Sequence, residues 1–172
     1  LFQRKDVSCL VNPRACKEVA LSAPPSTPTA QKMAVVGAGP AGLSASTELA
    51  ALGHEVHLFE ASAEIGGQFN MAKRIPGKEE FYETLRYFGK MIEKNGVHLH
   101  LNTRVDADFL IQQGFQEVVL ATGVSPRTPQ IEGIEHPKVL SYIDVLLHNK
   151  PVGKKVAVIG AGGIGFDVSV FL

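Results

Sequence analysis

Short hydrophobic runs alternate with segments of helical periodicity along most of the chain. Four runs bounded by polar residues or glycine predict buried or half-buried strands, at residues 33–36, 55–60, 97–101 and 117–120. Three segments between them place apolar or small side chains on one helical face and predict helices, at residues 40–52, 78–95 and 106–113. Strands that alternate with helices in this way are typical of an α/β fold with a parallel sheet.

The C-terminal part of the chain begins to repeat this pattern. After a proline-containing extended stretch at 124–137, Ser141 predicts the N-cap of a short helix that ends near residue 148. Residues 155–159 then predict another buried strand, followed by a glycine turn and the start of a helix. The sequence therefore predicts one Rossmann-like unit and the beginning of a second.

The turn after the first predicted strand carries the glycine pattern of dinucleotide-binding proteins, in its required place between a strand and a helix. Gly37 permits a tight turn, Gly39 lets the backbone approach a pyrophosphate, and Gly42 lets the helix pack closely on the sheet. The open N–H groups at the helix start favour an anion, and a proline suits the first helical turn. The candidate pyrophosphate-binding residues are Gly37, Ala38, Gly39, Pro40, Ala41 and Gly42.

Other polar or glycine-containing positions follow the strands at the edge where such proteins bind ligands. Glu60 ends the second predicted strand, and its carboxylate can accept hydrogen bonds from ribose hydroxyls. The loop at 66–68 brings paired glycines and an amide near that edge, although a flexible surface loop is the alternative. The candidate residues of this loop and of the turn after the fourth strand are Gly67, Gln68, Ala121, Thr122 and Gly123.

A second glycine pattern near residue 160 has the same spacing as the first and also lies between a predicted strand and a helix start. Its candidate nucleotide-binding residues are Gly160, Gly162, Gly163 and Gly165. The residue that would read the ribose of this second nucleotide is not in the sequence, so we expect the second unit to be incomplete. We also expect Ile159, Ile164 and Val168 to form an unpartnered apolar face.

The composition excludes several functional classes. With 45% hydrophobic and 20% charged residues, the chain is typical of a globular protein. Its formal net charge of zero provides no basic field for nucleic acid or an anionic membrane. No apolar run approaches the roughly 18 residues of a membrane span, so we expect a cytoplasmic protein without either partner. The first residues lack a start methionine and a signal-peptide pattern, as expected of a piece of a longer chain.

Two pairs of potential metal ligands each have two interpretations. Cys9 and Cys16 are too few and too simply spaced to identify a site, which favours ordinary thiols. His98 and His100 fall on one face of a predicted strand. With no third ligand expected nearby, solvent-facing histidines are favoured over a metal pair. No triad, carboxylate pair or zinc site stands out, and no catalytic residue is predicted.

Five motifs resemble the C-terminal part of the bacterial NADPH-dependent 2,4-dienoyl-CoA reductases, a family of FMN, FAD and [4Fe–4S] oxidoreductases. The motifs are Ser8–Cys16, Ile65–Asn70, Ile75–Phe81, Leu120–Val124 and Val158–Asp167. The resemblance covers nearly the whole chain and is weakest in the linker at 18–30. It implies a Rossmann-like FAD-binding domain at 31–152, of the type with two dinucleotide-binding domains. The start of an NADPH-binding domain at 153–172 interrupts it.

The resemblance also implies a path for electrons. In that family an N-terminal TIM barrel with FMN reduces the dienoyl-CoA, and a [4Fe–4S] cluster passes electrons to it from FAD, which NADPH reduces. FAD and NADP(H) are thus the expected cofactors of this segment. FMN and the cluster are expected in the full-length protein, where the barrel is a partner in the same chain. The dienoyl-CoA site itself lies outside the segment.

Individual roles follow from matching positions in the family. Cys9 matches the last cluster cysteine, within a cluster-segment tail at 1–17. A cluster needs four thiolates, so this segment alone is not expected to hold one.

Three other residues match FAD contacts in the family. Gln68 and Val105 match FAD contacts, Val105 through its backbone near the adenine. Glu60 matches the ligand of the adenosine ribose. Lys78 is a candidate cation for balancing phosphate charge.

Two alternatives stay open at this point. The chain could belong to a related flavoprotein, such as a trimethylamine dehydrogenase-like enzyme or an enoate reductase; in the former the corresponding domain holds a nucleotide in a structural role. It could also be a non-catalytic nucleotide-binding or electron-transfer module that serves a separate partner. The second glycine pattern at 160–165 favours a working two-cofactor module.

Overall fold

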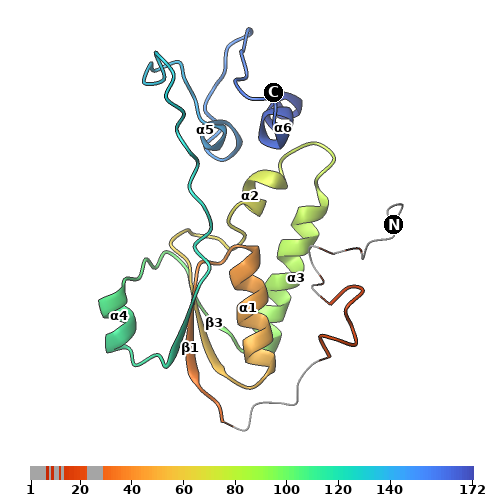
Figure 1. Ribbon diagram of the computed structural model, residues 1–172, viewed down its shortest axis with the longest axis vertical. Helices are drawn as coiled ribbons and strands as arrows, with labels where there is room; N and C mark the ends of the chain where they lie inside the picture. The colour runs from red at the N-terminus through yellow and green to blue at the C-terminus, as the bar shows by residue number, and fades with distance from the viewer. Residues whose placement is uncertain (1–6, 8, 10–11, 13, 23–28) are drawn as a thin grey trace.

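Four parallel strands form the sheet on which the chain is built (Figure 1). The computed structural model describes residues 7, 9, 12, 14–22 and 29–172. The strands are β1 (Lys32–Val36), β2 (Glu55–Phe59), β3 (His98–His100) and β4 (Glu117–Leu120), in the order β3-β2-β1-β4. Because β1 has a parallel partner on each side, the turn that follows it lies in the middle of the sheet's carboxyl edge. The predicted α/β class and parallel sheet are confirmed.

Helices cover both faces of the sheet, because parallel strands need crossover connections. The helices that lie on the sheet are α1 (Pro40–Ala51), α3 (Glu80–Asn95) and α4 (Ala107–Gln112). α1 and α3 pack side by side on one face, and α4 lies on the other (Figure 1).

Each face of the sheet has its own core, as the alternation of side chains along a strand requires. The core under α1 and α3 consists of Val35, Ala38, Leu43, Val56, Leu58, Phe88, Ile92 and Val97. The core under α4 is smaller and consists of Ala34, Phe59 and Leu110. The adjacent residues Ala34 and Val35 thus anchor opposite faces of the same strand.

α3 illustrates how the sequence sets a local structure. Phe88 and Ile92 are four residues apart and are both buried against the sheet, as predicted. The helix ends at Gly96, whose φ of +69° is left-handed and is adopted by glycine without steric cost. The predicted helix is confirmed to within two residues at its start.

A second, smaller group of helices lies beyond the carboxyl edge of the sheet (Figure 1). It contains α2 (Phe69–Ala72), α5 (Tyr142–Leu146) and α6 (Gly163–Phe171). Ile75, Leu146 and Val168 form its core. The Arg74 guanidinium donates to the Leu146 carbonyl and to the Asn149 side-chain oxygen, which fixes the end of α5.

α5 begins with the cap that the sequence predicted. The Ser141 hydroxyl accepts a hydrogen bond from the Asp144 backbone N–H at 3.1 Å. The Asp144 carboxylate accepts one from the Ser141 backbone N–H at 3.0 Å. This reciprocal capping box satisfies two N–H groups that the helix itself leaves unpaired.

The structure differs from the sequence prediction at two strands. Residues 155–159 do not form a strand, because none of the described strands pairs with them. β4 does form, but Leu120 is 74% exposed rather than buried. Among the described residues, β1 is the one strand that pairs with β4, so β4 lies at an edge of the sheet. The short helix α2 was not predicted either, because four residues give no measurable periodicity.

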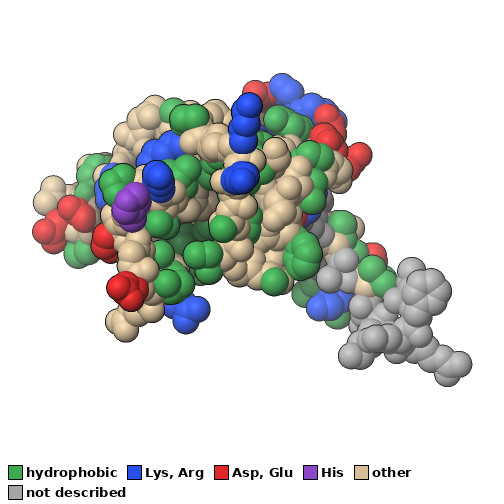
Figure 2. Space-filling view, turned by 90° about the horizontal axis from the view of Figure 1, so that it is seen from above, with side chains coloured by type: hydrophobic (Ala, Val, Ile, Leu, Met, Phe, Trp, Pro, Cys, Tyr) green, Lys and Arg blue, Asp and Glu red, His purple; other side chains and the backbone are tan. Residues whose placement is uncertain are grey.

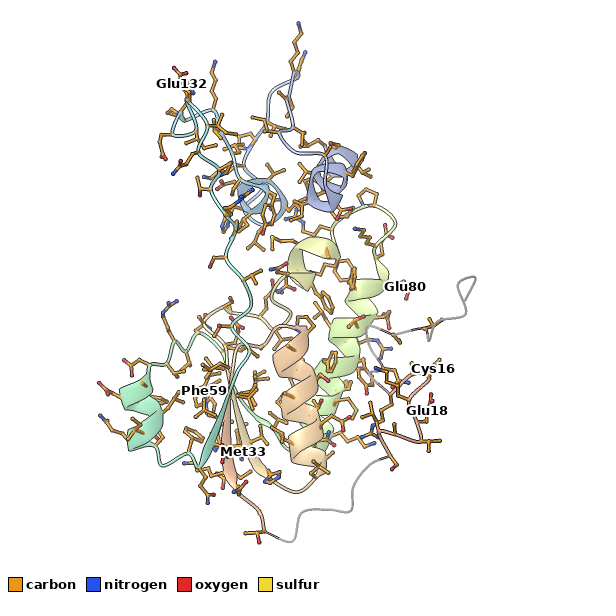
Figure 3. All side chains as sticks on the ribbon, viewed as in Figure 1. Cys16, Glu18, Met33, Phe59, Glu80 and Glu132 are labelled. Carbon is orange, nitrogen blue, oxygen red and sulfur yellow. The ribbon has the colours of Figure 1, made fainter. Side chains whose placement is uncertain are left out.

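The N-terminal segment is described only in part. The prolines of the predicted linker, within 23–28, lie outside the described residues, as does most of the predicted cluster-segment tail at 1–17. Among the described residues, Arg14 forms an ion pair with Glu48 of α1 at 2.7 Å. Figure 3 shows Cys16 and Glu18 on the same segment, beside α3. Both cysteines are exposed.

Hydrophobic side chains reach the surface over the end of the molecule that carries α5 and α6 (Figure 2). Ile159 and Ile164 are exposed, as expected. Val168 was expected to join them but is 8% exposed, because it packs against Ile75 and Leu146. Among the described residues, no helix is both long enough and apolar enough to cross a bilayer.

The core under α1 and α3 provides a test of the fold. Leu58 lies in the middle of β2 and is 0% exposed. Leu58→Ala is expected to lower the free energy of unfolding by about 2–5 kcal/mol, through lost burial and the cavity left behind. Ile111→Ala, at a position that is 75% exposed, is the matched control and should change it by less than about 0.5 kcal/mol. Urea unfolding followed by circular dichroism measures both, and equal losses would contradict this core assignment.

Candidate functional site

The turn after β1 is packed against the turn after β4. Gly37 has a φ of +103°, and a Cβ on it would lie 2.4 Å from the Ala121 carbonyl oxygen. The Ala121 N–H also donates to the Val36 carbonyl at 2.8 Å. Only glycine fits this position, because both the backbone angle and the close approach exclude a side chain. The structure thus brings two of the predicted turns together.

The start of α1 is open toward solvent. Gly39 is its N-cap residue, and no side chain caps the first N–H groups. Among the described residues other than its chain neighbours, a Cβ on Gly39 would meet no atom within 4 Å, whereas one on Gly42 would lie 1.8 Å from the Gly37 carbonyl oxygen. Gly42 is therefore required by helix packing, and Gly39 leaves free space beside unpaired backbone donors. Such a helix start attracts an anion such as a phosphate.

Glu60 lies beside this turn and is fixed by backbone donors. Its two carboxylate oxygens accept hydrogen bonds from the N–H groups of Ala38 and Ser62, each at 2.8 Å. Burial would raise the pKa of Glu60, but these donors outweigh it and hold the pKa below its usual value. The side chain is therefore an ionised acceptor at neutral pH.

The segment after β3 is bonded to the same loop. The Glu60 N–H donates to the His100 carbonyl at 2.9 Å, and the Thr103 N–H donates to the Glu60 carbonyl at 2.8 Å. Val105 follows two residues later and packs against the core under α4. The predicted adenine contact through Val105 stays a prediction, but this residue lies on the segment that borders Glu60.

The loop at 66–68 also lies against the first glycine turn. The Gly66 N–H donates to the Ala38 carbonyl at 2.7 Å. A Cβ on Gly67 would lie 3.0 Å from the Gly39 Cα, so the two backbones are nearly in contact. Gln68 is exposed at the start of α2 and lines a small cavity together with Tyr142. The loop is thus a wall of the site rather than a detached surface loop.

Lys78 has a different neighbour from the one that the sequence suggested. Its ammonium lies 2.6 Å from both carboxylate oxygens of Asp167 in α6. This ion pair links the segment before α3 to the second group of helices. A role for Lys78 toward phosphate stays a prediction, and in this arrangement Asp167 competes for its charge.

The second glycine turn has the same backbone geometry as the first. Gly160 has a φ of +114°, and Gly162 is the N-cap of α6 with φ −85° and ψ −178°. The corresponding angles at Gly39 are −74° and −179°. A Cβ on Gly165 would lie 2.0 Å from the Gly160 carbonyl, and one on Gly162 would meet nothing within 4 Å. Gly163 is the first residue of α6, and the start of this helix is likewise open.

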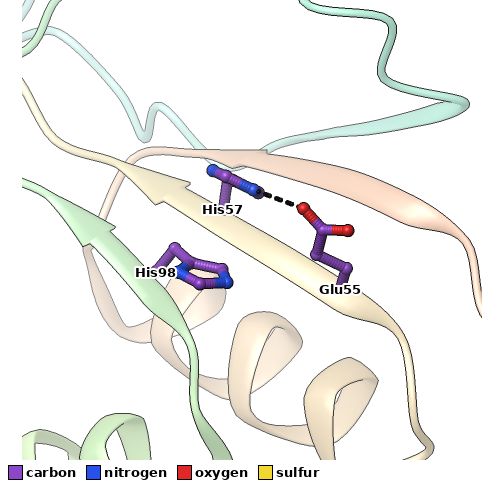
Figure 4. A group of neighbouring side chains, drawn as sticks. All are labelled: Glu55, His57 and His98. Atoms are coloured by element: carbon purple, nitrogen blue, oxygen red, sulfur yellow. Dashed lines mark hydrogen bonds and ion pairs between the residues drawn. The ribbon is translucent and has the colours of Figure 1, made fainter.

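The structure places Cys9 and His98, two candidate metal ligands, in different surroundings. Within the described part of the chain, Cys9 belongs to no group of three potential metal-ligating side chains, and its cluster role stays a prediction. His98 was expected to lack a third ligand nearby, and that expectation is wrong. Glu55 and His57 of β2 lie beside it (Figure 4). Strand pairing creates this group, which no local pattern could have predicted.

The chain resembles known proteins over nearly its whole length. The profile of the pyridine nucleotide-disulphide oxidoreductase family matches residues 31–172. A metal reductase of Desulforamulus reducens is 36% identical over 178 residues, which cover 100% of this chain and 26% of that protein. A cinnamate reductase of Clostridium sporogenes is 36% identical over 174 residues, which cover 96% of this chain and 24% of that protein.

Solved structures give the same relationship. A 2-naphthoyl-CoA reductase in complex with 2-naphthoyl-CoA has a TM-score of 0.90 and 35% identity, covering 95% of this chain and 25% of that chain. A histamine dehydrogenase from Rhizobium sp. 4-9 has a TM-score of 0.73 and 25% identity, covering 84% of this chain and 24% of that chain. The chain thus spans about a quarter of the length of the relatives it matches.

The hydrogen bonds of Glu60 predict a pH dependence of stability. Because the folded state lowers its pKa below 4.5, ionised Glu60 stabilises the fold fully above that pH. This contribution is lost as the pH falls below 4.5 through the folded-state pKa. The stability difference between the native chain and Glu60→Gln should therefore shrink on acidification, as measured by urea unfolding at a series of pH values.

A matched control is Glu132→Gln, at an exposed residue at the opposite end of the molecule from β2 (Figure 3). It should follow the native pH profile throughout. A constant difference between the native chain and Glu60→Gln at every pH would contradict the assigned hydrogen bonds.

Proposed function

The chain belongs to the pyridine nucleotide-disulphide oxidoreductase family, and from this premise we propose that it is the FAD- and NAD(P)H-binding electron-input part of a larger oxidoreductase. The two glycine turns with matching geometry carry the proposal. Each ends in an uncapped helix start with free space beside its middle glycine, Gly39 or Gly162. Two such turns provide for two dinucleotides.

The residues around the first turn fit FAD. The start of α1 would hold the pyrophosphate, and Glu60 would accept hydrogen bonds from the adenosine ribose in place of those from Ala38 or Ser62. The loop at 66–68 and the turn at 121–123, which border the first glycine turn, would contact other parts of the bound cofactor. When bound, the flavin would take a hydride from a reduced nicotinamide and pass the electrons onward. The second turn, at 160–165, would hold the pyrophosphate of that nicotinamide nucleotide.

For the whole protein we propose reduction of a 2,4-dienoyl-CoA, with electrons passing from NADPH through FAD and a [4Fe–4S] cluster to FMN. The motif resemblance and the relationship to a 2-naphthoyl-CoA reductase support an acyl-CoA substrate. The relatives also include a cinnamate reductase, and the segment matched covers about a quarter of those proteins; we propose that the substrate binds to a part outside it. Cys9 would supply one of the four cluster thiolates. The FMN of an N-terminal barrel would accept the electrons.

A second candidate is a module of the trimethylamine dehydrogenase type, in which the nucleotide is structural. The similarity to a histamine dehydrogenase supports this second candidate. The open second turn at Gly162 favours a working two-cofactor module instead, because a structural nucleotide at the first turn would leave it without a use.

Gly39 separates cofactor binding from folding. Gly39→Ala meets no protein atom within 4 Å, so it should change the stability of the protein without cofactor by no more than about 1 kcal/mol. Its methyl group would occupy the space needed by the pyrophosphate and should weaken FAD binding about tenfold or more, or ~1.4 kcal/mol. Fluorescence titration of the deflavinated protein with FAD measures the affinity.

The matched control for this experiment is Gly89→Ala, in the middle of α3. A Cβ there also meets nothing within 4 Å. It should raise stability by about 0.5–1 kcal/mol and leave FAD affinity unchanged. Native affinity in Gly39→Ala would contradict the assigned pyrophosphate site.

Electron input is tested on the full-length protein under anaerobic conditions. NADPH should bleach its visible flavin bands, and a 2,4-dienoyl-CoA added afterwards should restore them. Restoration by cinnamate but not by the dienoyl-CoA would leave the electron-input role intact and reject the proposed substrate. A bound adenine nucleotide with no flavin at this site would reject the FAD assignment and support the second candidate.

A further inference from the structure

Three histidines and one glutamate lie together on a single face of the sheet at the β2–β3 pair. His57 is directly opposite His98 in the parallel register. Glu55 precedes His57 by two residues and therefore points to the same face. The residues come from segments about 40 positions apart in the sequence, and strand pairing alone unites them (Figure 4).

The donor atoms of this group lie close enough together for small side-chain movements to place them around one metal ion. The His57 Nε2 lies 3.0 Å from the Glu55 Oε1. Two ligands at about 2.1 Å from a tetrahedral zinc ion are about 3.4 Å apart, so these two atoms need to separate by only a few tenths of an ångström to admit the ion. One donor atom from each of Glu55, His57 and His98 lies within 4.8 Å of the other two, so a shared ion would draw the exposed His98 side chain closer to them.

His57 also has the outer partner that ligating histidines usually have. Its Nδ1 lies 2.9 Å from the His100 Nε2. With an ion on Nε2, the Nδ1–H of His57 would donate to that nitrogen, which selects the tautomer and holds the ring plane. Without an ion, the proton on Nε2 can be donated to Glu55 instead. The same contacts therefore serve both states if His57 and His100 both change tautomer, since the His100 Nε2 accepts in one state and donates in the other.

The surroundings fix His57 and leave the other two donors accessible. The His57 ring stacks on His98 with centroids 4.7 Å apart, and it meets the edge of Phe115 at 5.2 Å. The Glu55 side chain is 53% exposed, so an ion can enter from solvent. Lys32 is the nearest cation on β1, but its ammonium donates to the Gln113 carbonyl at 2.9 Å and lies over the Phe115 ring.

We propose that Glu55, His57 and His98 form a binding site for one divalent ion of borderline softness, with Zn²⁺ as the representative ion. Two imidazoles and one carboxylate are a common donor set for zinc, and a fourth position would face solvent. The bound ion would cross-link β3, which lies at one edge of the sheet, to β2. Glu60, which follows β2 and is proposed to bind the nucleotide, is not one of the metal donors.

The experiment uses the full-length protein with its cofactors. Equilibrium dialysis against Zn²⁺, followed by elemental analysis for zinc and separately for iron, counts the zinc bound per chain. The native protein should bind one Zn²⁺ at this site, and the double variant Glu55→Gln/His98→Gln should lose it or bind it at least about tenfold more weakly. Zn²⁺ should also raise the thermal midpoint of the native protein and not that of the double variant.

The matched control is His136→Gln/His148→Gln, at two exposed histidines outside the group. It should retain native zinc affinity and stoichiometry. Native circular dichroism and flavin content in each variant would exclude misfolding as the cause of a loss. His57→Gln tests the third ligand and should lose the ion as well. Equal zinc binding by the native protein and the double variant, or an equal loss in the control, would overturn the proposal.

Discussion

The close contact between Gly37 and the Ala121 carbonyl is the constraint on which the site depends. It allows the chain to leave β1 in a tight turn and to begin α1 at once, with its open N–H groups at the carboxyl edge of the sheet. The same contact joins the turn after β4 to the turn after β1, and Gly42 then seats the helix against the Gly37 carbonyl. A side chain at either glycine would separate these elements and remove the anion-binding geometry.

Two kinds of polar group around this contact would contribute to the proposed binding of a nucleotide. Backbone N–H groups of the helix start provide positive potential without a charged side chain, and Glu60 provides an ionised acceptor beside them. Such a site binds and orients a cofactor whose own rings perform the redox chemistry. This division explains why the candidate site is made of glycines, small residues and one carboxylate.

The two ends of β2 have different chemistry. Its carboxyl end presents Glu60 to the glycine turn, whereas its first half presents Glu55 and His57 to β3. Since a strand is rigid along its length, an ion bound at the first half would stiffen the pair β2–β3 without entering the nucleotide site. The sheet would then support one site at its edge and another on its face.

Several features of the molecule depend on residues that are near one another in the chain, and these could be predicted. It predicted the parallel α/β fold, both glycine turns, the helix from about residue 80 to Asn95 and the cap of α5 at Ser141. These depend on local backbone freedom, helical periodicity and capping. The second glycine turn even forms without a strand at 155–159, because its geometry resides in Gly160 and Gly165.

Features that depend on partners far apart in the chain could not be predicted and are set by the way the elements pack. Residues 155–159 have strand-like composition but no described strand beside them, and Leu120 of β4 is exposed although Val119 of the same strand packs against the core under α1 and α3. Lys78 meets Asp167, 89 positions away, and Glu55, His57 and His98 meet through strand register. Hydrophobic pattern specifies which face of a strand is buried, but it does not specify which strand lies next to it.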